Sequence, residues 1–574
     1  MSTLRRAIAL TVVAGAAAAA VSAATAPSRD DRVVQLADRV ALAIGGRIQL
    51  AMVRATPQQA TLLAQGFDLT EHGRDGELGV VLYPGDQARL AATGLDYRVV
   101  ADDMVADDIR DRLAEQDWVA QDASPVRPLP GESPTGYRTL AEHEAALRQL
   151  AADNPDFVRV LELPNATHEG RTVVALQIAA DPDAAFTDGR PMSILTGLHH
   201  AREWPSAELT TMFAHDVVAQ YNAGNLDITT IIDNVNFIVI PVVNPDGYVR
   251  SRETVSDFLV PVPSAAVLAA SEFAYHRKNL ADTGGNGITG QGVDPNRNYP
   301  YKWGGPGASP DPSSATYHGP TPGSEPEVRN VLGLLRANQV TTFITNHTFG
   351  DMVLRPFGDS DRDTPDEAII KGHADAMAAI NGYASIKGIE LYATTGTTED
   401  WIYGVTGAPG FTFEIGSNDV SGGQLAAGGV DCSGFHPMYF LCVPEQYQLN
   451  RGAYLLNLRQ ALNTQWHSRL VGTAEPGTVL ILRKDVEFPL SVAFDGDEWM
   501  RDYVETTLVV GVDGAFDWHV NPSPTPQTVM DIADGFGTDD DLETWTLTAT
   551  GPDGSVTVVE DLLVRRGEIH EFAF

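Results

Sequence analysis

Four apolar segments of this chain each end in polar residues that could bind one metal ion together. The segments and their endings are MSILTGL before His199-His200-Ala201-Arg202-Glu203, FIVIPVV before Asn244-Pro245-Asp246, TTFIT before Asn346-His347, and FTF before Glu414. In open α/β sheets, ligands collect outside the carboxyl ends of the strands. Because these endings contain His, Glu, His and Glu, they predict one metal-centred pocket, which is typical of a zinc hydrolase.

His200 and Glu203 are three residues apart, close enough for both side chains to reach one ion from a single turn of chain. Pro205 and the apolar run after it predict a helix that anchors them. A catalytic zinc needs three protein ligands and an open position for water, and His347 is the best candidate for the third ligand. His199 could compete, but the spacing to Glu203 favours His200. Taken alone, an HxxE pair also occurs by chance in many helices, and an isolated histidine is more often structural.

Residues 137–468 predict the α/β domain that positions these side chains. FIVIPVV is apolar on both faces, as a central strand of a covered sheet should be. Leu147 and Leu150 recur at helical spacing, which predicts a helix over residues 140–151. The chain is too long for a single core, so further domains are expected on either side.

Three regions flank this domain. Residues 27–124 predict a small α/β domain, because the strand-like segments RIQLAMV, GELGVVLY and YRVV alternate with the helix-like segments PQQATLLAQG and DQARLAATG. The proline- and glycine-rich residues 125–136 predict an exposed linker. A small domain, a linker open to proteases and an enzyme together indicate a zymogen with a propeptide; a permanent accessory domain is the alternative. Residues 474–574 contain short alternating strands separated by Asp-Gly turns, which predict a C-terminal β-sandwich.

The N-terminus and the composition indicate an exported protein. Arg5-Arg6, an apolar run and the small residues after it match a cleavable signal peptide over residues 1–26. No later segment approaches about twenty uninterrupted apolar residues, so no stable membrane insertion is expected. The formal net charge of −37 argues against nucleic acid as a partner, because its phosphates would be repelled. Cys432 and Cys442 are expected to form a disulfide in an exported chain, with two buried thiols as the alternative.

The order of motifs along residues 137–468 resembles that of the metallocarboxypeptidase family of carboxypeptidase A. The matching motifs are HAREW at 200–204, NPDGY at 244–248, RKN at 277–279, DPNRN at 294–298, TYHGPTPGSEPE at 316–327, NH at 346–347, DW at 400–401 and FTFE at 411–414. The resemblance implies an α/β fold with a mixed central sheet flanked by helices, and one catalytic Zn2+. Residues 255–271 read as an insertion that either borders the cleft or decorates the surface.

The resemblance also implies roles for single residues. By similarity, His200, Glu203 and His347 are the zinc ligands, Glu414 is the catalytic carboxylate, Arg277 polarises the scissile carbonyl, Asn296 and Arg297 bind the terminal carboxylate of the substrate, Arg202 is an auxiliary cationic contact, and Tyr392 is a mobile tyrosine that covers the bound end. These roles suit the side chains. Bound zinc lowers the pKa of water from about 15.7 toward about 7, and a planar guanidinium makes two parallel hydrogen bonds to a carboxylate.

Glu399 falls where relatives place the side chain at the base of the pocket for the departing C-terminal residue. A carboxylate in a confined pocket is costly unless a cation pairs with it, so Glu399 predicts a preference for basic C-terminal residues. The alternative is a side chain turned out to solvent beside Asp400, with a broad or apolar preference.

We therefore expect a secreted, zinc-dependent exopeptidase that removes single residues from peptide and protein C-termini and is made as a precursor. An amidase or peptidase acting on cell-wall peptides is one alternative, and it would need a different set of residues to recognise the substrate end. A non-catalytic zinc-binding adhesion protein is another. Arg277 and Glu414 argue against it, because a pure binder has no use for that pair.

Overall fold

The computed structural model describes residues 29–74, 76–120, 129–253, 273–285, 290–417, 425–426, 430–490 and 499–574. The expected signal peptide at residues 1–26 and the insertion at 255–271 lie outside these residues, as does the first part of the expected linker. Within the described residues, no helix has both the length and the apolar character that crossing a membrane requires.

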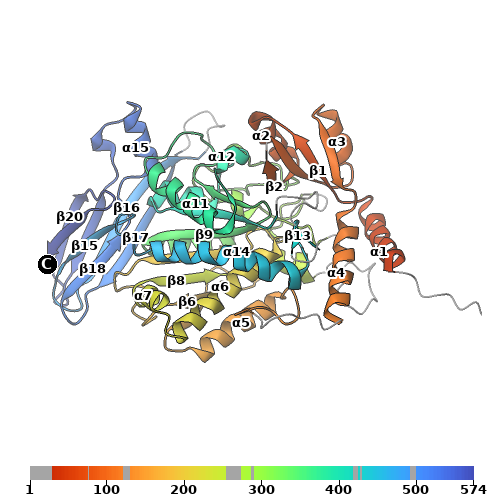
Figure 1. Ribbon diagram of the computed structural model, residues 1–574. Helices are drawn as coiled ribbons and strands as arrows, with labels where there is room; N and C mark the ends of the chain where they lie inside the picture. Colours follow the sequence, from red (N-terminus) through yellow and green to blue (C-terminus); the bar gives the residue numbers. More distant parts are fainter. Residues whose placement is uncertain are drawn as a thin grey trace, which may run out of the picture.

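An eight-stranded mixed sheet forms the centre of the molecule (Figure 1). In spatial order its strands are β11 (Ala384–Lys387), β10 (Met352–Arg355), β12 (Gly410–Ile415), β9 (Val340–Thr348), β7 (Met192–Gly197), β8 (Asn236–Ile240), β6 (Val174–Ile178) and β5 (Val158–Glu162). The four middle strands β12, β9, β7 and β8 are parallel to one another. They contain the four apolar segments that were predicted to end at one site, and every residue of β7, β8, β9 and β12 is buried.

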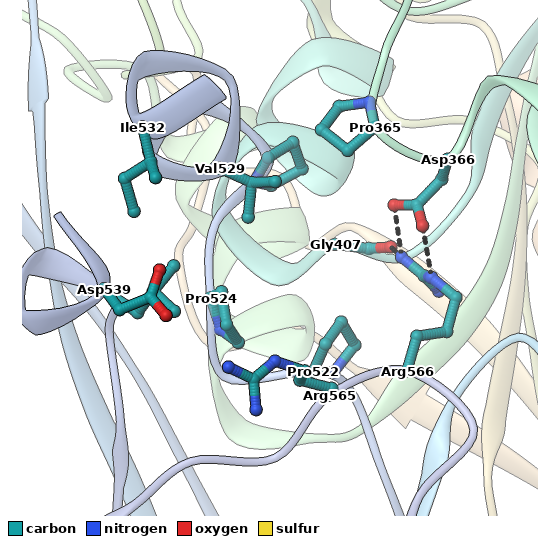
Figure 2. Close-up of a pocket in the computed structure, with 12 residues that line it drawn as sticks. Pro365, Asp366, Gly407, Pro522, Pro524, Val529, Ile532, Asp539, Arg565 and Arg566 are labelled. Carbon is teal, nitrogen blue, oxygen red and sulfur yellow. Dashed lines mark hydrogen bonds and ion pairs between the residues drawn. The ribbon is translucent and has the colours of Figure 1, made fainter. Parts of the chain in front are cut away.

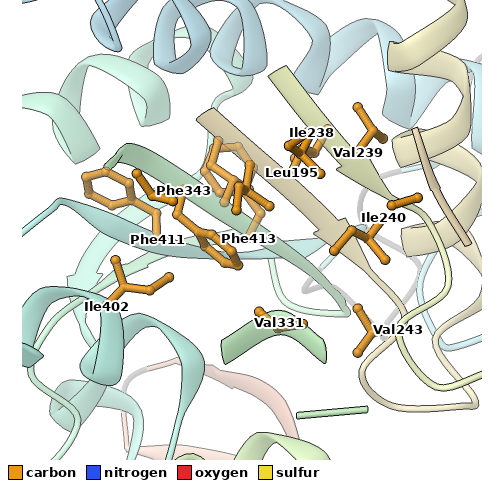
Figure 3. Close-up of a cluster of buried hydrophobic side chains, with 14 of the residues drawn as sticks. Leu195, Ile238, Val239, Ile240, Val243, Val331, Phe343, Ile402, Phe411 and Phe413 are labelled. Carbon is orange, nitrogen blue, oxygen red and sulfur yellow. The ribbon is translucent and has the colours of Figure 1, made fainter. Parts of the chain in front are cut away.

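Helices cover the sheet, as expected for strands that are apolar on both faces. The long helices are α5 (Leu140–Asp153), α6 (Trp204–Asn222), α7 (Leu226–Asn234), α10 (Pro326–Ala337), α11 (Glu367–Asn381) and α14 (Tyr439–Gln460). Figure 3 shows Leu195, Phe343 and Phe413 in the core of the sheet, with Val331 of α10 below the strands. Short elements in the loops are α8 (Pro245–Tyr248), η1 (Val249–Glu253), η3 (Pro295–Arg297), α12 (Gly388–Leu391), α13 (Thr398–Trp401), η4 (Ile402–Thr406), β13 (Leu425–Ala426) and β14 (Val430–Asp431). This mixed α/β architecture confirms the predicted fold class.

The N-terminal segment forms a separate four-stranded antiparallel sheet in the order β2-β3-β1-β4. Its elements are α1 (Arg29–Ile44), β1 (Gln49–Arg54), α2 (Pro57–Gly66), β2 (Asp68–Arg74), β3 (Glu77–Leu82), α3 (Asp86–Ala92), β4 (Tyr97–Ala101) and α4 (Met104–Ala120). Helix α2 coincides with the predicted helix PQQATLLAQG, because Thr56 and Gln59 form a reciprocal capping box at its start. The sequence pattern had not indicated α1, β2 or α4.

Two further sheets form the C-terminal part of the chain. One has the order β18-β15-β21, with β18 (Ala515–Val520), β15 (Ser468–Thr473) and β21 (Ile569–Ala573); the other has the order β17-β16-β19-β20, with β17 (Trp499–Val509), β16 (Val479–Pro489), β19 (Trp545–Thr550) and β20 (Val556–Leu562). Helix α15 (Pro526–Ala533) and η5 (Asp539–Asp541) connect them. Because β15 pairs with β18 and β21, these sheets begin at residue 468, before the expected start of the sandwich at 474.

Candidate active site

The parallel strands bring the predicted site residues to one edge of the central sheet. In the pairing of β12 with β9, Glu414 lies opposite His347, and in the pairing of β7 with β9, Gly197 lies opposite Asn346. His200 and Glu203 follow β7 within a short turn, and Glu203 directly precedes α6. The register of the sheet therefore sets where these side chains meet.

The side chains of His200, Glu203 and His347 meet beside this turn. His200 Nδ1 lies 2.7 Å from one carboxylate oxygen of Glu203, and His347 Nδ1 lies 2.9 Å from the other. The two Nδ1 atoms are 3.0 Å apart. Two imidazole nitrogens and a carboxylate, all buried and mutually adjacent, match the donor set that a catalytic zinc site with three protein ligands requires. The donor chemistry thus fits the predicted Zn2+.

Asp294 connects this donor set to Arg277. One of its carboxylate oxygens lies 3.1 Å from His200 Nε2, and the other accepts a hydrogen bond of 3.1 Å from Arg277 Nε. Burial opposes its ionisation, but Arg277 and His200 hold the pKa of Asp294 well below its usual range. A carboxylate on the far nitrogen of a ligand histidine fixes the ring orientation and raises its basicity. No role of Asp294 was predicted from the sequence, although the residue lies in the DPNRN motif.

His199 does not compete for the ion. Its Nε2 lies 3.0 Å from the hydroxyl of Tyr299, and its Nδ1 lies 3.1 Å from the hydroxyl of Thr345. Burial and the neighbouring His347 and His200 hold the pKa of His199 well below its ordinary value, which keeps the ring neutral. His199 is therefore a buried structural residue, and His200 is the ligand candidate that the spacing favoured.

The residues expected to bind the substrate end lie on loops beside this centre. Arg297 donates a hydrogen bond of 3.0 Å to the hydroxyl of Tyr392. The side-chain oxygen of Asn296 accepts 3.0 Å hydrogen bonds from the backbone N–H and the hydroxyl of Thr398. These contacts join the Asn296-Arg297 turn to Tyr392 and to α13, which also carries Glu399.

Glu399 points inward and not to solvent. Its side chain is only 5% exposed, and its Oε2 has no hydrogen-bonding partner among the described residues. Burial and the nearby Glu399 carboxylate raise the pKa of the neighbouring Asp400 well above its usual value. Because the Glu399 carboxylate is buried and one of its oxygens has no donor among the described residues, a cation beside it would be stabilised.

Arg202 is engaged by the N-terminal segment. Its guanidinium makes a two-pronged ion pair with Asp68 of β2, with Nη2 2.8 Å from Oδ1. Tyr83 donates a 3.0 Å hydrogen bond to the same carboxylate, and its hydroxyl also lies 3.2 Å from the carbonyl oxygen of Tyr275. Tyr392 packs in the hydrophobic cluster built from β1, β3 and α2. Arg202 and Tyr392 therefore both face the N-terminal segment.

Two cavities lie at the boundaries between parts of the chain. One, of about 330 Å3, is lined by Met104 and Asp108 of α4 and by Tyr275, Phe349 and His436 of the larger domain. Another, of about 290 Å3, lies beside α15 and contains the ion pair of Arg566 with Asp366 (Figure 2). None of the predicted site residues lines the second cavity.

The disulfide expected from the sequence is present in the structure. The structure joins Cys432 and Cys442, the latter in the first part of α14, with their Cα atoms 5.4 Å apart. The bond ties the start of α14 to the segment that carries Phe435 and His436.

Comparison with known proteins gives a consistent result. A family model described as zinc carboxypeptidase, Peptidase M14, matches residues 143–437. Carboxypeptidase A2 of Rattus norvegicus is 28% identical over 335 residues, which cover 57% of this chain and 72% of the rat protein. Carboxypeptidase B of Astacus astacus is 31% identical over 296 residues, which cover 49% of this chain and 86% of that protein. The solved carboxypeptidase A from Helicoverpa armigera has the same fold, with a TM-score of 0.56 at 21% identity over 72% of this chain and 97% of that one.

Proposed function

The chain belongs to the zinc carboxypeptidase family, and from that premise we propose that it hydrolyses the C-terminal peptide bond of peptides and proteins. One observation carries the proposal: His200, Glu203 and His347 converge at the sheet edge where Glu414 lies on the adjacent strand, opposite His347. Metal-assisted hydrolysis requires a set of metal ligands and, beside it, a carboxylate that can act as a base.

Each step of the reaction has a residue suited to it. Zinc held by the three ligands would lower the pKa of water so that it can attack at neutral pH. Glu414 accepts the proton of that water and passes it to the leaving amine. Arg277 donates to the carbonyl oxygen as negative charge develops there, and Asp294 holds the guanidinium in place through its Nε.

Recognition of the chain end falls to Asn296, Arg297 and Tyr392. The guanidinium of Arg297 suits a carboxylate because it offers parallel N–H donors in a plane. In the structure one of these nitrogens bonds to the Tyr392 hydroxyl, so the tyrosine lies over the place where the substrate end would bind. A neutral or amidated end would leave Arg297 without its counter-charge, which makes the enzyme an exopeptidase.

The identity of the released residue depends on Glu399 in this proposal. Its burial, its unpartnered oxygen and its link through Thr398 to the Asn296 side chain support a pocket that takes Lys or Arg. The contact with a cationic side chain would compensate the cost of the buried carboxylate. The relatives include proteins named carboxypeptidase A and carboxypeptidase B, so their names do not decide between apolar and basic ends.

We further infer that residues 27–124 act as an inhibitory propeptide and that 125–136 is the processed linker. Asp68 neutralises Arg202, one of the cationic groups expected to contact substrate, and the same segment packs on Tyr392. An acidic side chain from the precursor thus binds a substrate-binding cation. Export through the N-terminal signal, secretion of the mature enzyme, and an accessory role for the C-terminal sheets complete the proposal.

The direct test uses a panel of synthetic peptides with free and amidated C-termini, incubated with linker-cut protein in the presence and absence of a chelator. We expect release of single residues from free ends only, loss of release on chelation and recovery on adding Zn2+. Equal cleavage of amidated peptides would refute the exopeptidase assignment and favour the amidase alternative.

A further inference from the structure

A second group of potential metal ligands lies outside the proposed active site. His168 Nε2 lies 2.8 Å from Glu325 Oε2, and ligand atoms of His168, Glu325 and Glu327 all lie within 4.8 Å of one another. Glu325 directly precedes α10, and Glu327 lies in its first turn. The residues come from one loop and from the start of one helix, which are far apart in the sequence, and the fold alone brings them together.

Both carboxylates are buried, but Glu325 also accepts hydrogen bonds from Ser324 and His168, whereas Glu327 has less compensation. Glu327 is fully buried, and its Oε1 has no hydrogen-bonding partner among the described residues. Asn279 Nδ2 donates to Glu325 at 2.6 Å and to Glu327 at 3.1 Å, but an amide carries no charge. In the described part of the chain, His168 is the one cationic side chain that forms an ion pair with either carboxylate. A buried, under-compensated negative charge is costly, and a divalent cation would offset it.

The loop that carries His168 is held in place by bonds that do not involve the histidine. Asn165 and Asn330 of α10 pair reciprocally, with both N···O distances at 2.8 Å. Thr167 donates a 2.8 Å hydrogen bond to Asp246, which fixes the turn on its other side. The imidazole is therefore positioned before any ion binds, and its side chain remains 35% exposed, which leaves a route from solvent.

We propose that His168, Glu325 and Glu327 bind a second divalent transition-metal ion of the zinc type, with water completing its coordination. One imidazole nitrogen and two carboxylate oxygens suit Zn2+ or Co2+. Ca2+ prefers six to eight oxygen ligands and has no use for the imidazole, so it fits poorly. The inference is independent of the carboxypeptidase mechanism.

The second ion would brace the loops of the proposed active site. Asn279, which bonds both glutamates, is two residues from Arg277. The side-chain oxygen of Asn298, the neighbour of Arg297, accepts a 3.0 Å hydrogen bond from the backbone of Glu325. An ion that fixes the start of α10 would therefore also fix the segments that carry Arg277 and Arg297.

The test measures zinc bound per full-length chain by mass spectrometry after metal removal and reloading with Zn2+. We expect about two equivalents in the wild type and about one in His168→Ala, Glu327→Gln or His347→Ala, since each substitution removes a ligand from a single site. His168→Ala combined with His347→Ala should bind none. His570→Ala is the matched control, because His570 also contacts a glutamate, Glu568 at 3.1 Å, but belongs to no group of three potential metal ligands among the described residues.

The outcomes separate this inference from the proposed function. If the wild type binds one equivalent that only His347→Ala removes, the second site is wrong and the catalytic site stands. If it binds one equivalent that only His168→Ala removes, the catalytic ligand set is wrong and the second site stands. If His570→Ala also removes an equivalent, binding at His168 is adventitious. His168 is partly exposed, so its substitution leaves the core intact, and thermal unfolding of each metal-free variant checks the fold.

Discussion

Replacing Asp68 with Ala should activate the uncut chain. Arg202 is 0% exposed and Asp68 only 3% exposed, and their ion pair links the N-terminal segment to the turn that follows β7. Removing one partner leaves the guanidinium buried and unpaired while the segment stays docked. Breaking a buried pair in this way costs about 3–5 kcal/mol. Undocking lets water solvate Arg202, so the cost applies to the docked state alone.

The expected gain in activity follows from the free-energy cost of the broken ion pair. Because about 1.4 kcal/mol corresponds to a factor of ten, the ratio of undocked to docked chain should rise by roughly 100-fold to more than 1,000-fold. The activity of uncut Asp68→Ala should rise by the same factor until it reaches that of the fully processed enzyme. The assay compares initial rates on a blocked dipeptide for uncut and linker-cut protein, in which limited proteolysis has released a fragment ending between residues 115 and 136.

Glu77→Ala is the matched control for Asp68→Ala. Glu77 lies in the same small sheet and pairs with Arg54 and Arg98 of that sheet, at 3.3 Å and 3.0 Å, so its loss leaves the interface unchanged. If uncut Asp68→Ala stays as slow as the uncut wild type while the cut protein is active, this ion pair does not hold the segment in place. If the uncut wild type is already fully active, the zymogen interpretation is wrong and the segment is an accessory domain.

Three further predictions concern the active site. Glu414→Gln should keep its zinc but lose about 100-fold or more in kcat, because the substitution removes the proposed base and leaves the metal ligands in place. Glu445→Gln, the same change at an exposed position on α14, is the control and should behave as wild type. His347→Ala should lose the catalytic zinc in a metal analysis, since two remaining protein ligands hold the ion poorly, and retention of catalytic zinc and activity would contradict the ligand assignment. Glu399→Ile should shift the ratio of hippuryl-Arg to hippuryl-Phe turnover by about tenfold or more toward Phe, and an unchanged ratio would show that Glu399 does not set the pocket.

The sequence predicted well those features that depend on local pattern. FIVIPVV is uniformly apolar, and TTFIT combines two apolar side chains with β-branched threonines that favour strands, so their placement as central strands followed from composition. The polar residues after them then had to lie near the strand ends. Parallel pairing then placed Glu414 beside His347. The helix PQQATLLAQG was predictable because its cap is encoded within four residues.

Features that depend on contacts between distant segments were not predictable. Strand β2 (DLTEHGR) has no apolar alternation and becomes a strand only because β3 pairs with it. The ion pair of Asp68 with Arg202 could therefore not be predicted from the sequence. Asp294 lies in a recognisable motif, but its bonds to His200 and Arg277 exist only once three loops meet. His168 is separated from Glu325 by 157 residues, and no local pattern relates them.

The loops that we propose to bind substrate have little regular structure, and buried asparagines supply the hydrogen bonds that helices and strands provide elsewhere. Asn244 bonds the carbonyl oxygens of His199 and Lys278 at 3.1 Å each, Asn279 bonds two glutamates, and Asn298 bonds the carbonyl oxygens of His318 and Thr321. A buried backbone carbonyl that loses its donor costs about 1–3 kcal/mol, so each asparagine stabilises one loop conformation against others. His347 and Glu414 lie on strands of the sheet, whereas the segments that carry Arg277 and Arg297 are held by this amide network. Substituting Asn298, which contacts none of the proposed metal ligands through its side-chain nitrogen, should therefore impair substrate binding while leaving the catalytic zinc in place, which separates the two halves of the site experimentally.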